Sequence, residues 1–172
     1  MVSHMKKTLS LPKSKPADGG RRGARPARPG TARAPRTAPA LLSGRGLSRS
    51  APSTLIRSLK AGFSIRVLDE LRGRLGLPME KLVPMLGISK ATLHRRKLSG
   101  RLDTAESDRV VRYTRLLDKA VTVLESVEDA RRWLSAPQFG LGGAIPLEYA
   151  ETEVGAREVE DLLGRIEYGV YS

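Results

Sequence analysis

A regular spacing of apolar residues near the middle of the chain predicts one long amphipathic helix. The apolar positions recur at alternating three- and four-residue steps: Val110, Tyr113, Leu117, Val121 and Leu124. That spacing places them on one face of an α-helix, and Asp103 with Glu106 ahead of them has the spacing of a capping box in a carboxylate variant. The face is either the core of a bundle or the seam of a dimer, and the small size of the chain favours a core. The sequence therefore predicts an all-α fold.

Shorter helices are expected on both sides of this long one. Three precede it, over about residues 64–75, 78–86 and 89–99, each followed by a glycine that can end a helix. After it, Ser126 and Asp129 cap a helix that carries Trp133 and Leu134 and stops before Pro137. Pro146 is suited to open a short helix. A closing helix then places four apolar residues on one face: Val159, Leu162, Leu163 and Ile166.

The N-terminal part of the chain has no such pattern. Residues 1–53 hold 12 Lys or Arg and one acid, Asp18, and residues 6–53 contain seven of the eleven prolines. We expect residues 1–62 to form a disordered basic arm, which is either a solvated tail or an arm that grips DNA without reading its sequence. Residues 1–4 resemble an expression scar, so Met5 is the expected natural start.

Charge divides the rest of the chain. Residues 54–115 contain 14 basic and six acidic residues, whereas residues 116–172 contain five basic and 11 acidic ones; the whole chain carries +13. A basic middle suits a polyanionic partner, and an acidic end suits a partner of a different charge. At least two kinds of partner are therefore expected.

A helix-turn-helix is the predicted DNA-binding element, over residues 79–98. It needs two short helices, a glycine in the turn and an exposed polar second helix, and Gly87 supplies the turn. Pro84 inside the first helix and Arg96, at a position that such motifs commonly fill with an aliphatic residue, depart from the pattern. The alternative is a solvated basic helix. The predicted DNA-binding residues are Ser89, Lys90, Thr92, His94, Arg95, Arg96, Lys97 and Arg101, of which Arg96, Lys97 and Arg101 are expected on backbone phosphates.

Other chemistry finds little support in the sequence. Without cysteine there is no disulfide and no thiolate metal site, and His94 has no partner ligand. No nucleophile–base arrangement or glycine-rich phosphate loop occurs. No apolar run approaches the ~20 residues of a membrane span. We expect a cytoplasmic protein that is not an enzyme, needs no cofactor or metal and does not contact a membrane.

The C-terminal third carries an ordered set of residues: Trp133-Leu134, Pro137, Leu141-Gly142-Gly143, Pro146-Leu147-Glu148, Thr152, Gly155, Val159, Leu163 and Arg165-Ile166-Glu167-Tyr168-Gly169. This set resembles the toxin-binding domain of Xre-type antitoxins from RES–Xre toxin–antitoxin modules, a domain also named after MbcA and ParS. With the helix-turn-helix ahead of it, the resemblance covers about residues 63–172.

The resemblance implies an antitoxin with a DNA-binding domain at 63–125 and a toxin-binding domain at 126–172. Its C-terminal end would occlude the active site of a RES-domain, NAD-consuming toxin. Its helix-turn-helix would bind operator DNA and repress its own operon, as a homodimer within a larger toxin–antitoxin complex. The alternative is a stand-alone transcriptional regulator whose C-terminal domain only dimerises. The predicted toxin-binding residues are Leu141, Pro146, Glu148, Arg165, Glu167, Tyr168, Tyr171 and Ser172; Trp133 is expected in the core.

Overall fold

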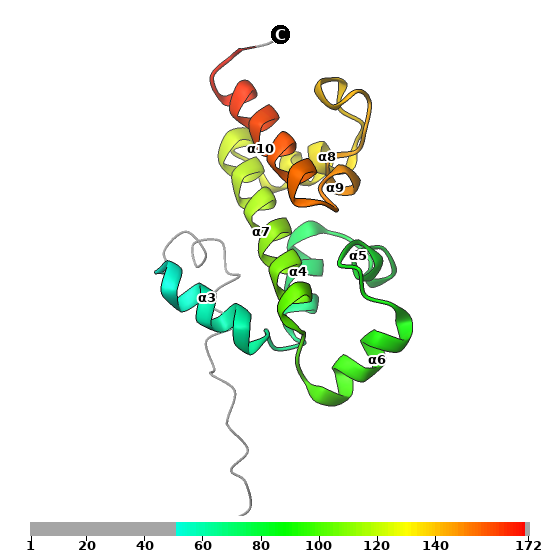
Figure 1. Cartoon of the computed structure of the whole chain (residues 1–172). Coiled ribbons are helices and arrows are strands. Elements are labelled where there is room, and N and C mark those ends of the chain that lie inside the picture. Colours follow the sequence, from blue (N-terminus) through cyan, green and yellow to red (C-terminus); the bar gives the residue numbers. More distant parts are fainter. Residues whose placement is uncertain (1–50, 171–172) are drawn as a thin grey trace, which may run out of the picture. The chain divides into compact units, whose positions relative to one another are not determined.

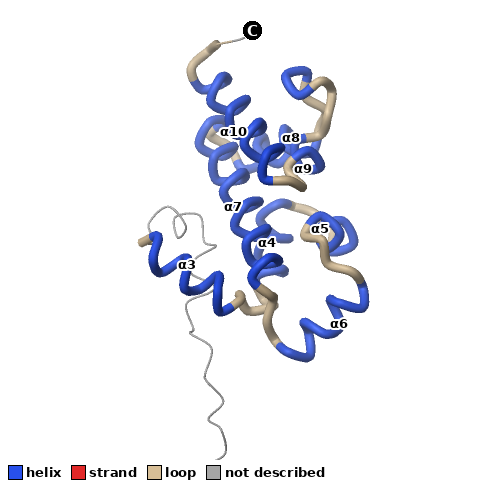
Figure 2. Tube along the Cα trace, viewed as in Figure 1, coloured by secondary structure: helices blue, strands red, loops and turns tan. Residues whose placement is uncertain are grey.

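The computed structural model describes residues 51–170. Residues 1–50 of the predicted arm and the toxin-binding candidates Tyr171 and Ser172 lie outside them. Figures 1 and 2 show a helical chain with short loops. The helices are α3 (Pro52–Ala61), α4 (Val67–Leu75), α5 (Met79–Met85), α6 (Lys90–Ser99), α7 (Thr104–Leu124), α8 (Val127–Ser135), α9 (Pro146–Tyr149) and α10 (Glu153–Glu167), with a 3-10 turn η1 at Phe139–Leu141. In this part of the chain, β-structure is limited to two isolated bridges, so the all-α prediction is confirmed.

The long helix α7 organises the core. Val110, Tyr113 and Leu117 are at most 1% exposed, and α7 packs against α3, α4, α8 and α10 (Figure 1). The apolar stripe is therefore a core face, as the small size of the chain favoured. Both halves of the capping box are present: Asp103 accepts a hydrogen bond from the Glu106 backbone N–H, and Glu106 accepts one from that of Asp103.

Residues 52–61 correct the prediction that the arm extends to residue 62, because they form helix α3. Pro52 occupies its first turn, where a missing N–H costs nothing. Leu55 and Leu59, one turn apart, pack against the core. A helix of this length is marginal alone in water, so packing against α7 stabilises it.

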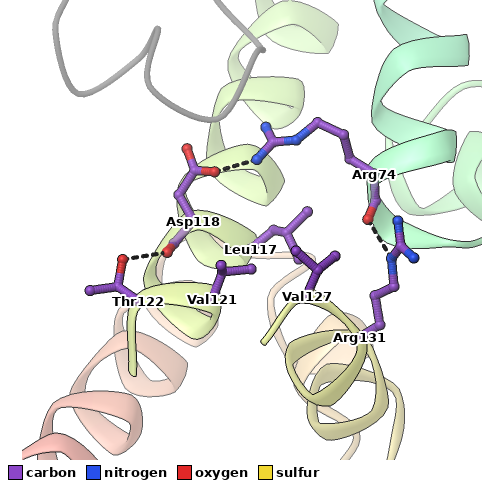
Figure 3. Close-up of a pocket in the computed structure, with 7 residues that line it drawn as sticks. All are labelled: Arg74, Leu117, Asp118, Val121, Thr122, Val127 and Arg131. Carbon is purple, nitrogen blue, oxygen red and sulfur yellow. Dashed lines mark hydrogen bonds and ion pairs between the residues drawn. The ribbon is translucent and has the colours of Figure 1, made fainter. Parts of the chain in front are cut away.

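Two tertiary contacts join the N-terminal helices to the C-terminal ones. The Arg131 guanidinium of α8 donates to the backbone carbonyls of Gly73 and Arg74, both at 2.8 Å. These carbonyls end α4 and have no partner in the helix itself. Figure 3 shows the hydrogen bond from Arg131 to the Arg74 carbonyl beside the Arg74–Asp118 ion pair. Both lie around a cavity of about 340 Å³ that Leu117, Val121, Thr122 and Val127 also line.

Tyr113 makes the second contact. Its hydroxyl donates to the backbone carbonyl of Leu147 in α9 at 3.3 Å and lies 3.5 Å from that of Met85 in α5. Burial raises the pKa of Tyr113 to about 12, so the hydroxyl stays protonated as a donor. Among the described helices, none is both long and apolar enough to cross a membrane.

Candidate functional sites

The first candidate site is the pair α5 and α6 with the turn between them. Gly87 in the turn has a positive φ of 65°, and a Cβ atom there would come within 3.0 Å of the Arg109 guanidinium. That guanidinium in turn donates to the Leu86 carbonyl at 3.0 Å. Leu82, Leu86 and other apolar side chains of this unit are buried. Pro84 is accommodated as an exposed residue near the end of the short helix α5.

Helix α6 presents a basic outer surface. Ser89 caps it: its Oγ accepts from the Thr92 backbone N–H at 3.1 Å and lies 3.0 Å from the Thr92 hydroxyl. The hydroxyls of Ser89 and Thr92 therefore bond to each other. The cationic and imidazole side chains predicted to meet DNA are exposed and form no ion pair within residues 51–170: Lys90, His94, Arg95 and Lys97.

Arg96 corrects the predicted set, because it is bound inside the protein instead of facing outward. Its Nε donates to the Glu106 carboxylate at 2.7 Å, and its Nη2 donates to Asp103 at 2.6 Å. The hydrogen bond with Glu106 raises the pKa of Arg96. Glu106 is only 4% exposed, and a buried carboxylate needs such a partner. Arg96 therefore ties α6 to the start of α7 and is not placed to hold a phosphate.

The second candidate site is a groove beside the C-terminal end of α10. It has a volume of about 660 Å³ and is lined by Gln138, Phe139, Gly140, Leu162, Arg165, Ile166 and Val170. Gln138 anchors one wall, since its side-chain amide donates to the Trp133 and Ala136 carbonyls. Gly140 lets this wall approach α10, because a Cβ there would lie 2.6 Å from a Leu162 methyl group.

The groove has an apolar surface that the sequence alone did not identify. Phe139 is 97% exposed and Val170 is 54% exposed. Leu162 and Ile166 were expected on one helix face with Val159 and Leu163; they are half-buried and line the groove, whereas Val159 and Leu163 are buried. An aromatic residue directly before the glycine-rich loop 140–143 was the available signal for Phe139.

The structure separates the predicted toxin-binding residues. Glu148, Glu167 and Tyr168 are exposed, Tyr168 by 78%, and Arg165 is half-buried in the groove wall. Pro146 corrects the predicted set: it is buried as the first residue of α9, so its side chain is not a free contact. Leu141 is half-buried and packs against the core, as Trp133 does.

Ion pairs hold α10 against α7. Arg112 donates to the Glu153 carboxylate at 3.0 Å and to the Glu151 carbonyl at 2.8 Å, and Arg115 pairs with Glu153 and Glu160. Burial disfavours the charged form of Glu153, but the hydrogen bonds from Arg112 and Arg115 outweigh it and lower the Glu153 pKa. No group of three or more His, Cys, Asp or Glu residues in the described part of the chain is arranged to hold a metal ion.

Two protein-family models match this chain, one over each half of the described residues. The model of the antitoxin Xre-like helix-turn-helix domain matches residues 54–115. The model of the antitoxin Xre/MbcA/ParS C-terminal toxin-binding domain matches residues 119–169. The two matches meet inside α7, earlier than the boundary expected at residue 125, and the first begins within α3. One continuous helix therefore contributes to both domains.

Individual relatives agree with the family models. The chain is 39% identical over 129 residues to "Antitoxin Xre" of Yersinia enterocolitica, and 30% identical over 129 residues to "Antitoxin Xre" of Photorhabdus laumondii. It is 25% identical over 138 residues to the "Prs ADP-ribosylating antitoxin" of Sphingobium sp.. Each match covers 74% of this chain and 87% of the relative. With its helix-turn-helix and its toxin-binding domain in the same order, the chain belongs to the Xre family of antitoxins.

Proposed function

We propose that this antitoxin neutralises a RES-domain, NAD-consuming toxin by covering the toxin's active site with its C-terminal domain. The likeness to antitoxins of RES–Xre modules supports the toxin class. The name of the Sphingobium relative supports NAD chemistry, since ADP-ribosylation consumes NAD. The protein would act in the cytoplasm and would have no catalytic residue of its own.

The exposed end of α10 carries this proposal. Tyr168 is 78% exposed at the end of the helix, and Gly169 takes a positive φ of 67° there, which lets the chain turn away from the helix axis. The groove with Phe139 lies beside it. In the proposed complex the toxin covers the groove and buries Phe139, while Tyr168 at the end of α10 enters the toxin's active site. Aromatic residues at the centre of interfaces commonly contribute most of the binding energy.

The two roles can be separated by two substitutions. Phe139→Ala should weaken toxin binding by at least about 2 kcal/mol, the threshold of an interface hot spot, measured by calorimetry with the purified toxin. Tyr168→Ala, or deletion of residues 169–172, should leave a measurable complex but reduce protection of the toxin's NAD site, read as residual NAD consumption in the saturated complex. Leu98→Ala, which removes an apolar side chain from α6 that is 78% exposed, as Tyr168 is, serves as the control. Neutralisation that survives the deletion unchanged contradicts occlusion by the C-terminal end.

We also propose that the helix-turn-helix represses the antitoxin's own operon as a homodimer on an inverted repeat. The exposed, unpaired Lys90 and Arg95 on α6 support direct contact with DNA. The two-fold symmetry of a dimer would be matched by two half-sites about one helical turn apart. Footprinting on the DNA upstream of the gene should show two protected segments at that spacing. A single half-site, or none, contradicts the proposed dimer.

A further inference from the structure

The end of α6 is held against the segment that leads into α4. The Ile65 backbone N–H donates to the Gly100 carbonyl at 3.0 Å, and the Leu102 N–H donates to the Phe63 carbonyl at 2.9 Å. Ser64 and Arg101 form the isolated bridge between these hydrogen bonds. The end of α3 and the start of α4 are therefore fixed beside the C-terminal end of α6, the second helix of the helix-turn-helix.

The backbone of Gly62, at the end of α3, lies close to the backbone of Leu102, just after the end of α6. Gly62 ends α3 with a φ of 74°, and a Cβ atom on it would lie 2.1 Å from the Leu102 carbonyl oxygen. Lys60, two residues earlier, is exposed, and so is Arg66 at the N-cap of α4. With the half-buried Arg101 they form what we call the basic patch: Lys60, Arg66 and Arg101.

The basic patch has no neutralising partner inside the described part of the protein. None of its three side chains forms an ion pair there. Of the nearby carboxylates, Asp103 and Glu106 already bind Arg96, and Asp69 and Glu70 in the first turn of α4 form no ion pair with Arg66. Helix α3 carries no acidic residue at all. The patch is therefore a group of three cations without ion pairs within residues 51–170, beside the end of α6.

Arg101 adds an independent observation. Its Nε is buried and has no hydrogen-bond partner among the described residues. A buried polar group without a partner is costly, and more so when it carries charge. An external anion beside the guanidinium would offset the charge that the protein itself leaves uncompensated.

We infer that the basic patch binds backbone phosphates of DNA beyond those that the start of α6 contacts, so that the DNA interface extends onto α3. Helix α6 has ten residues and spans about 15 Å. The basic patch, at the C-terminal end of α6, therefore lies too far from the N-terminal end of the helix to contact the same phosphate. Phosphate contacts fix the position of a protein on DNA without reading sequence. This inference rests on the DNA binding proposed above, and it assigns to α3 and Arg66 a role that the helix-turn-helix itself does not require.

The test is the salt dependence of binding to a short random-sequence duplex, measured by fluorescence anisotropy with the full chain. Each lost phosphate contact should make the log–log slope of affinity against salt less steep by about 0.9. Lys60→Ala combined with Arg66→Ala should therefore change the slope by about 1.8 per bound chain, since both positions are exposed and neither supports the core. Lys60→Arg combined with Arg66→Lys should retain the wild-type slope.

The matched control removes two positive charges elsewhere. Arg132→Ala with Arg157→Ala changes the net charge equally, and these side chains are 77% and 73% exposed on α8 and α10. An equal change of slope in this control would overturn the basic patch, because the effect would then be one of net charge. A wild-type slope in the Lys60→Ala, Arg66→Ala variant would overturn the inference that the basic patch binds phosphates, and would leave the proposed DNA binding by α6 standing. A wild-type protein that binds no duplex even at low salt would overturn both the patch and the proposed DNA binding.

Discussion

Two glycines in the same helix should respond in opposite directions to the same substitution. Gly155 lies in the first turn of α10 and Gly164 lies in its last turns. A Cβ on Gly155 would come within 1.9 Å of the Tyr149 backbone oxygen, whereas a Cβ on Gly164 would meet only the Lys119 amino group at 3.7 Å. The first contact is with backbone, which cannot rotate away. The second is an ordinary van der Waals contact.

The magnitudes follow from these distances. Alanine in place of glycine in a helix gains about 0.5–1 kcal/mol of stability when nothing obstructs the methyl group. Gly164→Ala should gain that amount. Gly155→Ala meets strain at the upper end of the about 1–3 kcal/mol typical of overpacking, and should lose a net of about 2 kcal/mol after the helix gain. The two variants should therefore differ by about 3 kcal/mol.

Urea unfolding followed by circular dichroism measures both free energies of unfolding. Because the first turn of α10 rests directly on the backbone of α9, Gly155→Ala should also weaken toxin binding, while Gly164→Ala should not. If Gly155→Ala had the same urea midpoint as the wild type, the packing of α10 on α9 would be wrong. If both alanines were stabilising, helix propensity alone would explain the result.

Two further predictions concern the contacts between helices. Arg131→Ala should lower the free energy of unfolding by about 1–2 kcal/mol, because two terminal carbonyls of α4 lose a charged donor that water partly replaces. The control is the neighbouring Arg132→Ala, which removes one exposed ion pair and should cost under about 0.5 kcal/mol. Equal losses in the two variants would refute a stabilising role for the Arg131 hydrogen bonds. The lowered pKa of Glu153 contributes stability that is present above its ordinary pKa of 4.5 and is lost as the pH falls through the lower pKa of the folded protein. Glu153→Gln should make the free energy of unfolding depend less on pH below 4.5, measured by unfolding experiments at several pH values. An unchanged loss of stability in acid would exclude the Arg112–Glu153 contact as its source.

Local signals predicted most of the helices because they act within a few residues of sequence. The capping box of Asp103 and Glu106, the cap Ser126, and the helix-ending glycines Gly76 and Gly100 all appear as expected. Each of these residues either accepts a hydrogen bond from a free backbone N–H at the start of a helix or ends the helix in a left-handed conformation. Both effects act within about three residues of the sequence.

The candidate sites depended more on contacts distant in sequence. Arg96 lies on a basic helix and resembles a DNA contact by position, but the buried carboxylate of Glu106, contributed by the next helix, determines where its guanidinium points. Phe139 and Leu162 are apolar residues like those of the core. Whether such residues are covered depends on the packing of η1 against α10, which no local pattern encodes.

The sequence by itself determined that the chain is helical, where its main helices begin and end, and that a basic helix-turn-helix precedes an acidic domain of the antitoxin type. Only the tertiary structure decided that residues 52–61 form a helix, and that Pro146 is buried while Phe139 is exposed. The physical reason is range: caps and amphipathic stripes act over one or two turns, whereas burial and ion pairing depend on which surfaces the fold brings together.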